Sequence, residues 1–250
     1  MSDKTKVLVN FIQDRSGSMQ TIWDETLNGF KEFVKELQTK GPAENIDYLF
    51  SLTTFDTVID MPLKAVPIAD VTLDALASYG PRGATAIYDA VGKTIDATMQ
   101  AKDDTITKVV CVIVTDGQEN SSREWTKDAI HKAIEAKLNL GNWTFTYLGT
   151  QPETWDEASS IGVGAGASAN YVGAQASAAY SNVAQAVHTM SRSSAMGSRS
   201  LLSRYGNAKS MRGAGMSVNP GSSQRLPIKP PVPAAPEPPK GKGKVNRRWR

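Results

Sequence analysis

Two apolar runs mark the segments of this chain that are expected to be most deeply buried. Residues 6–12 and 108–115 are apolar at nearly every position, which is typical of parallel strands covered on both faces. Further strands are predicted at four segments: 46–53, 57–60, 143–148 and 169–172. Because 57–60 follows the preceding strand by only a few residues, we expect a short antiparallel edge strand there.

The segments between these strands repeat their apolar residues at helical spacing. Within 22–38, for example, Phe30, Phe33 and Leu37 fall on one stripe and charged residues lie opposite. Helices are predicted at 22–38, 85–100, 124–138 and about 175–191. Alternating strands and helices predict an α/β fold, with a doubly wound, mostly parallel sheet, one short antiparallel edge strand and helices on both faces.

Charge divides the chain into two parts. The chain has 250 residues and a formal net charge of +3, but residues 192–250 contain thirteen Lys and Arg against a single acid, Glu237. That segment therefore carries +12 and residues 1–191 carry −9. Eight of the thirteen prolines lie from Pro220 onward, so little apolar surface is available there to offset the entropy of ordering. We expect one domain over 1–191 and a disordered, Ser/Gly/Pro-rich basic tail over 192–250.

The location of the protein is also predicted from absences in the sequence. Residues 1–6 lack the apolar region of a secretory signal, and no run reaches the length of about 18 apolar residues that a membrane span needs. The single cysteine, Cys111, lies in an apolar strand and is expected to be an inert buried thiol. A cytoplasmic protein that makes no membrane contact, and is a monomer, is the expectation.

The loop after the first strand has the composition of a cation site. In D-R-S-G-S, a carboxylate at Asp14 and hydroxyls at Ser16 and Ser18 occupy alternate positions between a strand and a helix. Mg²⁺ prefers near-octahedral oxygen ligands at about 2.1 Å, and these three side chains are small oxygen donors. Gly17 allows the backbone to bend tightly around an ion.

Two further loops supply the missing oxygen donors. Thr85 lies at the start of a predicted helix, after a Gly-Pro-Arg-Gly turn, and Asp116 follows the second buried strand. Open α/β sheets bind ligands outside the carboxyl ends of their strands, where Asp14 and Asp116 are both predicted to lie. The absence of His and Cys from these loops favours Mg²⁺ or Mn²⁺ over zinc.

These loops, D-x-S-G-S, G-x-T and T-D-G in that order, resemble the von Willebrand factor A family over residues 5–191, in particular its stand-alone bacterial or phage members. The resemblance implies a metal-ion-dependent adhesion site whose matching positions are Asp14, Ser16, Ser18, Thr85 and Asp116. It also implies that the metal binds an Asp or Glu carboxylate of a protein partner, without enzymatic turnover.

Several alternatives remain beside this interpretation. Asp14, Ser16 and Thr85 are also residues that cap helices, and Asp116-Gly117 is also an ordinary turn sequence. The basic residues of 240–250 suit contact with nucleic acid or another polyanion, which would make the tail the functional part of a structural protein. The same charge would also suit docking on the acidic domain of this chain, or would serve solubility alone. A third alternative is an accessory subunit of an ATPase or chelatase complex.

Overall fold

The computed structural model describes residues 4–101, 104–150, 153–164, 167–170, 175–192 and 217–218. One seven-stranded sheet runs through these residues in the order β3-β2-β1-β4-β5-β6-β7. Its strands are β1 (Thr5–Asp14), β2 (Ile46–Phe55), β3 (Ile59–Pro67), β4 (Ile106–Val114), β5 (Trp143–Gly149), β6 (Ser168–Asn170) and β7 (Ser217–Val218). The five central strands, β2, β1, β4, β5 and β6, are parallel, while β3 and β7 pair antiparallel at the two edges.

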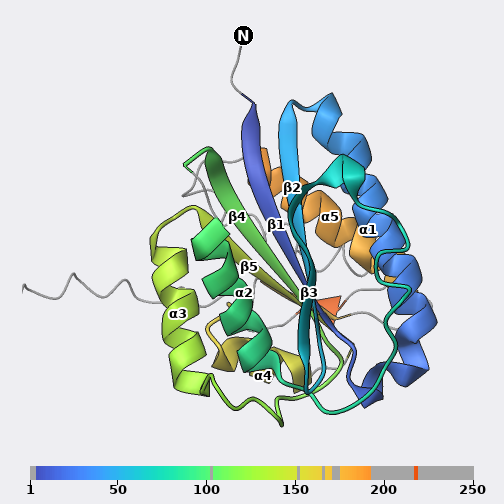
Figure 1. Cartoon of the computed structure of the whole chain (residues 1–250), viewed down its shortest axis with the longest axis vertical. Helices are drawn as coiled ribbons and strands as arrows, with labels where there is room; N and C mark the ends of the chain where they lie inside the picture. The colour runs from blue at the N-terminus through green and yellow to red at the C-terminus, as the bar shows by residue number, and fades with distance from the viewer. Residues whose placement is uncertain are drawn as a thin grey trace, which may run out of the picture.

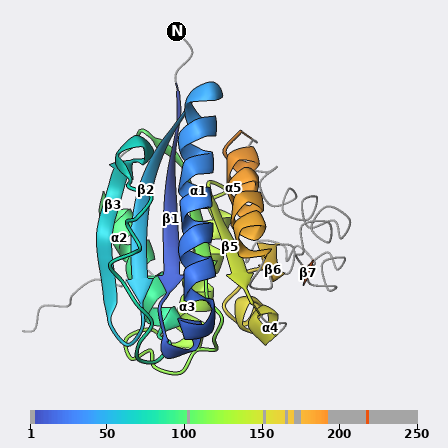
Figure 2. The same cartoon turned by 90° about the vertical axis from the view of Figure 1, so that its right-hand side faces the viewer.

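Five α-helices cover the two faces of this sheet: α1 (Trp23–Ala43), α2 (Ile87–Ala101), α3 (Lys127–Asn139), α4 (Glu153–Ser160) and α5 (Ala176–Arg192). Helices α1 and α5 lie side by side on one face, as Figure 2 shows. The other three pack on the opposite face (Figure 1). The doubly wound α/β architecture predicted from the sequence is confirmed.

The continuous apolar run of β1 divides its side chains between these two faces. Phe11 packs on the α1 side, with its ring 4.9 Å from that of Phe33 and 5.4 Å from that of Phe30. Its neighbour Ile12 belongs to the second cluster, with residues of α2, α3 and α4. Successive side chains of a strand point to opposite faces, so a strand covered on both faces needs apolar residues at nearly every position.

Both antiparallel edges differ from the sequence prediction. Strand β3 covers nine residues instead of the predicted 57–60, and most of its side chains are only half-buried, which weakens its apolar pattern. Pro62 and Lys64 interrupt that pattern further, and such residues are typical of protected sheet edges. At the other edge, Ser217 and Val218 pair with β6, although 192–250 was predicted to be disordered. The remainder of that predicted tail after Arg192 lies outside the described residues.

The strand order places a topological switch point beside β1. The chain passes from β1 to β2 on one side through α1, and β4 pairs with β1 on the other side. Loops that leave neighbouring strands in opposite directions open a crevice at their carboxyl ends. In Figure 1 those ends lie at the bottom of the view, where α1 and α2 also begin.

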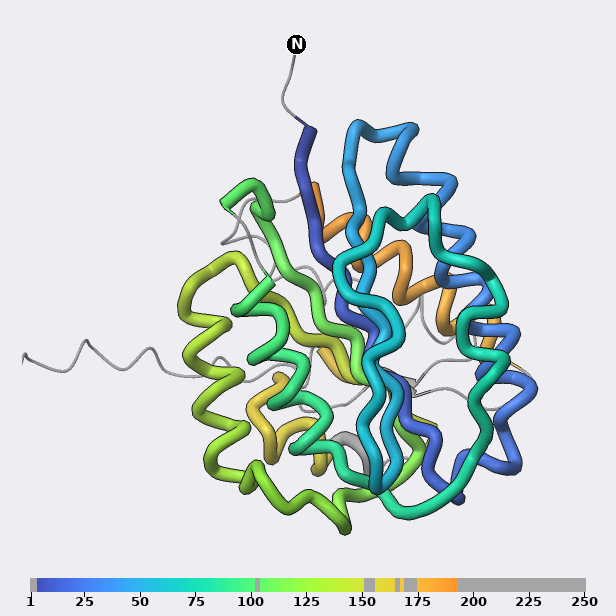
Figure 3. Tube along the Cα trace, viewed as in Figure 1, coloured from blue at the N-terminus to red at the C-terminus, as the bar shows by residue number. Residues whose placement is uncertain are grey.

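The connection from β3 to α2 is long and packs against the rest of the domain. After a short 3-10 helix, η2 (Ile68–Asp70), the chain runs beside α1 and returns below the sheet to α2 (Figure 3). Gln38 of α1 donates its amide hydrogens to the carbonyls of Ile68 and Val71, both at 2.9 Å. This path delivers Thr85 to the carboxyl end of the sheet.

None of the described helices is long and apolar enough to cross a membrane.

Candidate metal centre

The hydroxyls of the first loop connect directly to the carboxylate that follows β4. Ser18 Oγ lies 2.7 Å from Asp116 Oδ1 and donates its proton to it, and Ser16 Oγ lies 3.1 Å from Ser18 Oγ. Because the single hydroxyl proton of Ser18 is directed to Asp116, Ser16 is the donor to Ser18. Both loops begin where neighbouring parallel strands end, which explains how residues 98 positions apart meet.

Asp14 is the most deeply buried carboxylate of this cluster. Its side chain is inaccessible to solvent, and it accepts hydrogen bonds from the backbone N–H of Ser16 at 2.6 Å and from Thr115 Oγ1 at 2.5 Å. Burial raises the pKa of Asp14 to about 6, although the hydrogen bonds from Thr115 and Ser16 oppose the shift and the charge of Asp116 adds to it. A buried carboxylate of this kind gains from a nearby cation.

Thr85 comes from the third loop and faces the other two. A Cβ atom built on Gly117 would lie 3.2 Å from Thr85 Oγ1 and 3.5 Å from Ser18 Oγ. The backbone of Gly17 donates a hydrogen bond of 3.1 Å to the carbonyl of Gly83, which ties the Thr85 loop to the first. The structure therefore brings Asp14, Ser16, Ser18, Thr85 and Asp116 together.

The donor set of this cluster fits a hard divalent cation. Two carboxylates and three hydroxyls supply only oxygen, and the described residues hold no group of three or more His, Cys, Asp or Glu side chains suited to a metal. A side chain at position 117 would crowd Thr85 Oγ1, so glycine keeps that side of the cluster open. Whether the five side chains act as metal ligands stays a prediction.

Two residues that support the cluster were not identified from the sequence. Thr115, which bonds Asp14, directly precedes Asp116 in T-D-G, and it also accepts from the backbone N–H of Gly117 at 3.1 Å. Asn120 accepts a 2.8 Å hydrogen bond from the N–H of Thr85 and donates its own N–H to the Thr85 carbonyl at 3.0 Å. Thr115 lies within T-D-G and Asn120 shortly after it, which was the available sequence signal, but Asp14 and Thr85, with which they bond, come from distant parts of the chain.

The loop after Asp116 is held in place by a buried carboxylate on α2. Asp89 accepts hydrogen bonds of 2.7–3.0 Å from three successive backbone N–H groups, those of Arg123, Glu124 and Trp125. The indole of Trp125 packs over Gly92, where an added Cβ would lie 2.3 Å from its ring. Asp89 therefore orders the segment that carries Asn120 and is not itself part of the cluster.

The alternative roles considered for the site residues find limited support. Ser16 is the N-cap of the short 3-10 helix η1 (Gly17–Ile22), but its side chain makes no capping hydrogen bond. The two histidines, which would be needed to activate Ser16 or Ser18 as a nucleophile, have partners elsewhere. His131 Nδ1 lies 3.0 Å from the carbonyl of Ser160, and His188 Nδ1 lies 2.9 Å from Tyr48 Oη.

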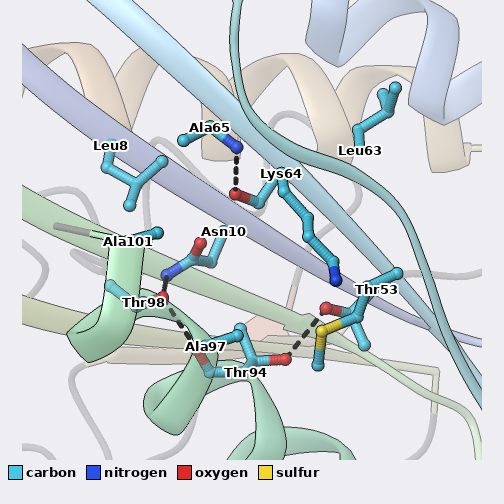
Figure 4. A pocket seen from close by; sticks show the side chains of 12 residues that line it. Leu8, Asn10, Thr53, Leu63, Lys64, Ala65, Thr94, Ala97, Thr98 and Ala101 are labelled. Atoms are coloured by element: carbon cyan, nitrogen blue, oxygen red, sulfur yellow. Dashed lines mark hydrogen bonds between the residues drawn. The ribbon is translucent and has the colours of Figure 1, made fainter.

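Cys111 and a small cavity also lie apart from this cluster. Cys111 is fully buried, as predicted, and burial raises the pKa of its thiol to about 12. The cavity, about 40 Å³, lies between β3 and α2 and is lined by residues such as Asn10, Thr53, Lys64 and Thr98 (Figure 4). None of its lining residues is a carboxylate or a histidine, so it offers no competing metal site.

Comparison with known proteins relates this fold to solved structures. No protein-family model and no curated protein sequence matches the chain. The von Willebrand factor type A protein from Catenulispora acidiphila matches at 15% identity over 72% of this chain and 42% of its own, with a TM-score of 0.54. The pilus adhesin SpaC from Lactobacillus rhamnosus GG matches at 14% identity over 74% and 31%, with a TM-score of 0.57.

A third solved structure matches over nearly its whole length. The vWF domain of the type V pili tip protein Mfa5 from Porphyromonas gingivalis is 14% identical over 76% of this chain and 97% of its own, with a TM-score of 0.60. The match therefore spans less than half of the first two proteins and almost all of this isolated domain. At these identities the likeness concerns the fold alone: the chain has the fold of von Willebrand factor type A domains.

Proposed function

We propose that this protein is a protein-interaction module that binds Mg²⁺ or Mn²⁺ through Asp14, Ser16, Ser18, Thr85 and Asp116, and presents the metal to a carboxylate of a partner protein. The observation that carries the proposal is the meeting of three loops, from separate parts of the chain, in one cluster of five oxygen-bearing side chains. No catalytic turnover is part of the proposal.

The chemistry of the five side chains supports binding of an acidic ligand. The hydroxyls of Ser16, Ser18 and Thr85 are neutral, so only Asp14 and Asp116 would offset the charge of a divalent ion. A metal bound in this way would stay electrophilic and attract a further carboxylate, because carboxylate oxygens are ligands that Mg²⁺ prefers. The resemblance to pilus proteins supports a role in protein interaction at the level of the fold.

Calorimetric titration with Mg²⁺ and Mn²⁺ tests the metal site. We expect the wild type to bind either ion, and Asp14→Ala and Asp116→Ala to bind neither while remaining folded by circular dichroism. Asp74→Ala is the matched control, since the Asp74 side chain is 71% exposed and forms a surface ion pair with Lys31 at 2.8 Å. Unchanged metal binding in both site variants would overturn the assignment.

Affinity capture from a lysate of the native host tests the proposed partner. The bait is the full chain, in Mg²⁺ and in EDTA, with Asp14→Ala as a second bait. A partner that is lost both in EDTA and with the variant supports recognition through the metal. A partner retained under both conditions would assign recognition to another surface.

The charge of residues 192–250 favours a second candidate function. Their +12 suits contact with nucleic acid or another polyanion, through the basic residues of 240–250 in particular. Binding of this kind weakens steeply with salt and survives EDTA, and deletion of residues 219–250 is expected to abolish it. A subunit role in an ATPase or chelatase complex would instead appear in the capture experiment as an ATPase partner. A cytoplasmic location and a monomeric state remain predictions.

A further inference from the structure

Arg15 lies between the proposed ligands Asp14 and Ser16 and is almost completely buried. Only 3% of it is exposed, and its guanidinium lies 4.9 Å from the centre of the Tyr79 ring. Its Nη2 donates a 2.5 Å hydrogen bond to Asp60 Oδ2, and its Nε lies 3.0 Å from Asp56 Oδ2. The contact between Arg15 Nε and Asp56 is an ion pair that does not have hydrogen-bond geometry.

A second arginine, Arg82, also contacts Oδ2 of Asp56. Arg82 Nε donates a 2.8 Å hydrogen bond to Asp56 Oδ2, so the two guanidinium groups meet on one carboxylate oxygen. The other oxygen, Oδ1, accepts from the backbone N–H of Val58 at 2.6 Å. Asp56 is 1% exposed, and both of its carboxylate oxygens accept hydrogen bonds.

Backbone hydrogen bonds tie Arg15 to Phe55, the residue before Asp56, and to Arg82. The N–H of Arg15 donates to the Phe55 carbonyl at 2.8 Å, and the N–H of Arg82 donates to the Arg15 carbonyl at 2.8 Å. Arg15 lies between Asp14 and Ser16, and Arg82 lies three residues before Thr85. Asp56 follows β2, which contributes no residue to the cluster.

We propose that Arg15, Asp56 and Arg82 form an ionic clamp that positions Asp14, Ser16 and Thr85 for the metal. The proposal rests on the proposed metal site. Apart from the clamp, the hydrogen bonds that join the loop after β1 to the loop before α2, among the described residues, are between backbone groups. The three clamp residues are positioning residues, because the ion pairs and hydrogen bonds of their side chains, within the described residues, include no oxygen of the cluster.

A positioning role has a consequence for metal selectivity. Mg²⁺ requires near-ideal octahedral geometry at 2.0–2.1 Å, whereas Ca²⁺ accepts flexible coordination at 2.3–2.6 Å. Loops that are less well held would therefore lose affinity for Mg²⁺ more than for Ca²⁺. A residue that only stabilises the fold would lower the free energy of unfolding and leave the ratio of the two affinities unchanged.

The test variant is Asp56→Asn, measured by calorimetric titration of the full chain with Mg²⁺ and with Ca²⁺. The amide oxygen of asparagine retains an acceptor for Val58 N–H, while the negative charge that Arg15 and Arg82 share is removed; the contact of Arg15 with Asp60 is kept. We expect the Kd for Mg²⁺ to rise by about 10- to 100-fold, the range found when groups that orient metal ligands are removed. The Kd for Ca²⁺ is expected to rise by a clearly smaller factor.

Asp47→Asn is the matched control at the opposite end of β2. Asp47 forms an exposed pair with Lys4 at 3.3 Å, so its substitution is expected to leave both affinities unchanged. Loss of one partner of a buried ion pair is destabilising, and Asp56→Asn is measured only where circular dichroism shows the native fold. Arg82→Gln is the second variant, because the Arg82 side chain is 62% exposed and its loss removes one arm of the clamp.

The outcomes separate the two proposals. A wild type that binds neither ion overturns the metal site and the clamp with it. A wild type that binds Mg²⁺, together with Asp56→Asn and Arg82→Gln variants whose ratio of Mg²⁺ to Ca²⁺ affinity is unchanged, leaves the metal site intact and overturns the clamp. A lower ratio of Mg²⁺ to Ca²⁺ affinity in both Asp56→Asn and Arg82→Gln, with an unchanged ratio in Asp47→Asn, supports the clamp.

Discussion

Ser18 Oγ donates a 2.7 Å hydrogen bond to Oδ1 of Asp116, a residue 98 positions further along the chain. The bond joins the loop after β1 to the loop after β4 across the crevice between neighbouring parallel strands. Burial raises the pKa of Asp116, and the Ser18 hydrogen bond opposes that shift. Ser18 therefore supports the charged form of Asp116 and is itself a proposed metal ligand.

Ser18→Ala removes both contributions. We expect it to weaken Mg²⁺ binding by about tenfold or more, because one oxygen donor and the partner of a second are lost. Calorimetric titration measures the change. Thr39→Ala is the control, since Thr39 is an exposed α1 residue whose hydroxyl donates to the Lys35 carbonyl of its own helix at 2.8 Å. Equal affinities for Ser18→Ala and wild type would exclude Ser18 from the site.

Asp14→Asn is expected to stabilise the metal-free protein. A fully buried carboxylate whose pKa is raised from 3.8 to about 6 opposes folding at neutral pH by up to about 3 kcal/mol, and an amide avoids this cost. The amide nitrogen cannot accept one of the two hydrogen bonds that Ser16 and Thr115 donate to Asp14, which costs about 1 kcal/mol. We therefore expect the free energy of unfolding in EDTA to rise by up to about 2 kcal/mol, measured by urea denaturation. Mg²⁺ should stabilise the wild type and not the variant. A variant that is less stable than wild type in EDTA contradicts the prediction.

The stability of the metal-free protein should also depend on pH through Asp14. Because its folded pKa lies above the unfolded value of 3.8, the folded state binds more protons between about pH 4 and 6. The contribution of Asp14 to stability is therefore full below pH 4 and is lost as the pH rises through about 6. Urea denaturation of wild type and Asp14→Asn across this range isolates the effect, since the difference between them should grow toward pH 7.

Protons should compete with Mg²⁺ for the same carboxylate. A metal ligand must be deprotonated, so the affinity for Mg²⁺ is expected to fall by up to about tenfold per pH unit below pH 6 and to level off above it. Titrations between pH 5 and 8 measure this profile. An affinity that is constant from pH 5 to 8 would show that Asp14 is not titrated on binding.

Gly29→Ala tests the close approach of α1 and α5. A Cβ at Gly29 would lie 2.5 Å from a ring carbon of the fully buried Tyr180, so α5 would have to shift. We expect a loss of about 1–3 kcal/mol in the free energy of unfolding, despite the better helix propensity of alanine. Gly80→Ala is the control, because no atom lies within 4 Å of its added Cβ. Equal stability of the two variants would contradict this packing.

The prediction of the fold from sequence succeeded where the patterns are local. The apolar runs of β1 and β4 and the helical stripe of Phe30, Phe33 and Leu37 identify buried elements without knowledge of their neighbours. The edge strand β3 was predicted too short, since a half-buried edge carries a weak pattern. The pairing of Ser217 with Asn170 was not predicted, because two residues carry no periodicity.

The sequence by itself determined the doubly wound α/β class and which five side chains are candidates for a metal, because periodicity and loop motifs are properties of short segments. Only the tertiary structure decided how the loops are supported. Thr115 bonds Asp14 from 101 positions away, and Arg15 and Arg82 meet on Asp56, a residue outside every motif. Such contacts depend on which strands become neighbours and how their loops pack, and a local pattern carries no information about either.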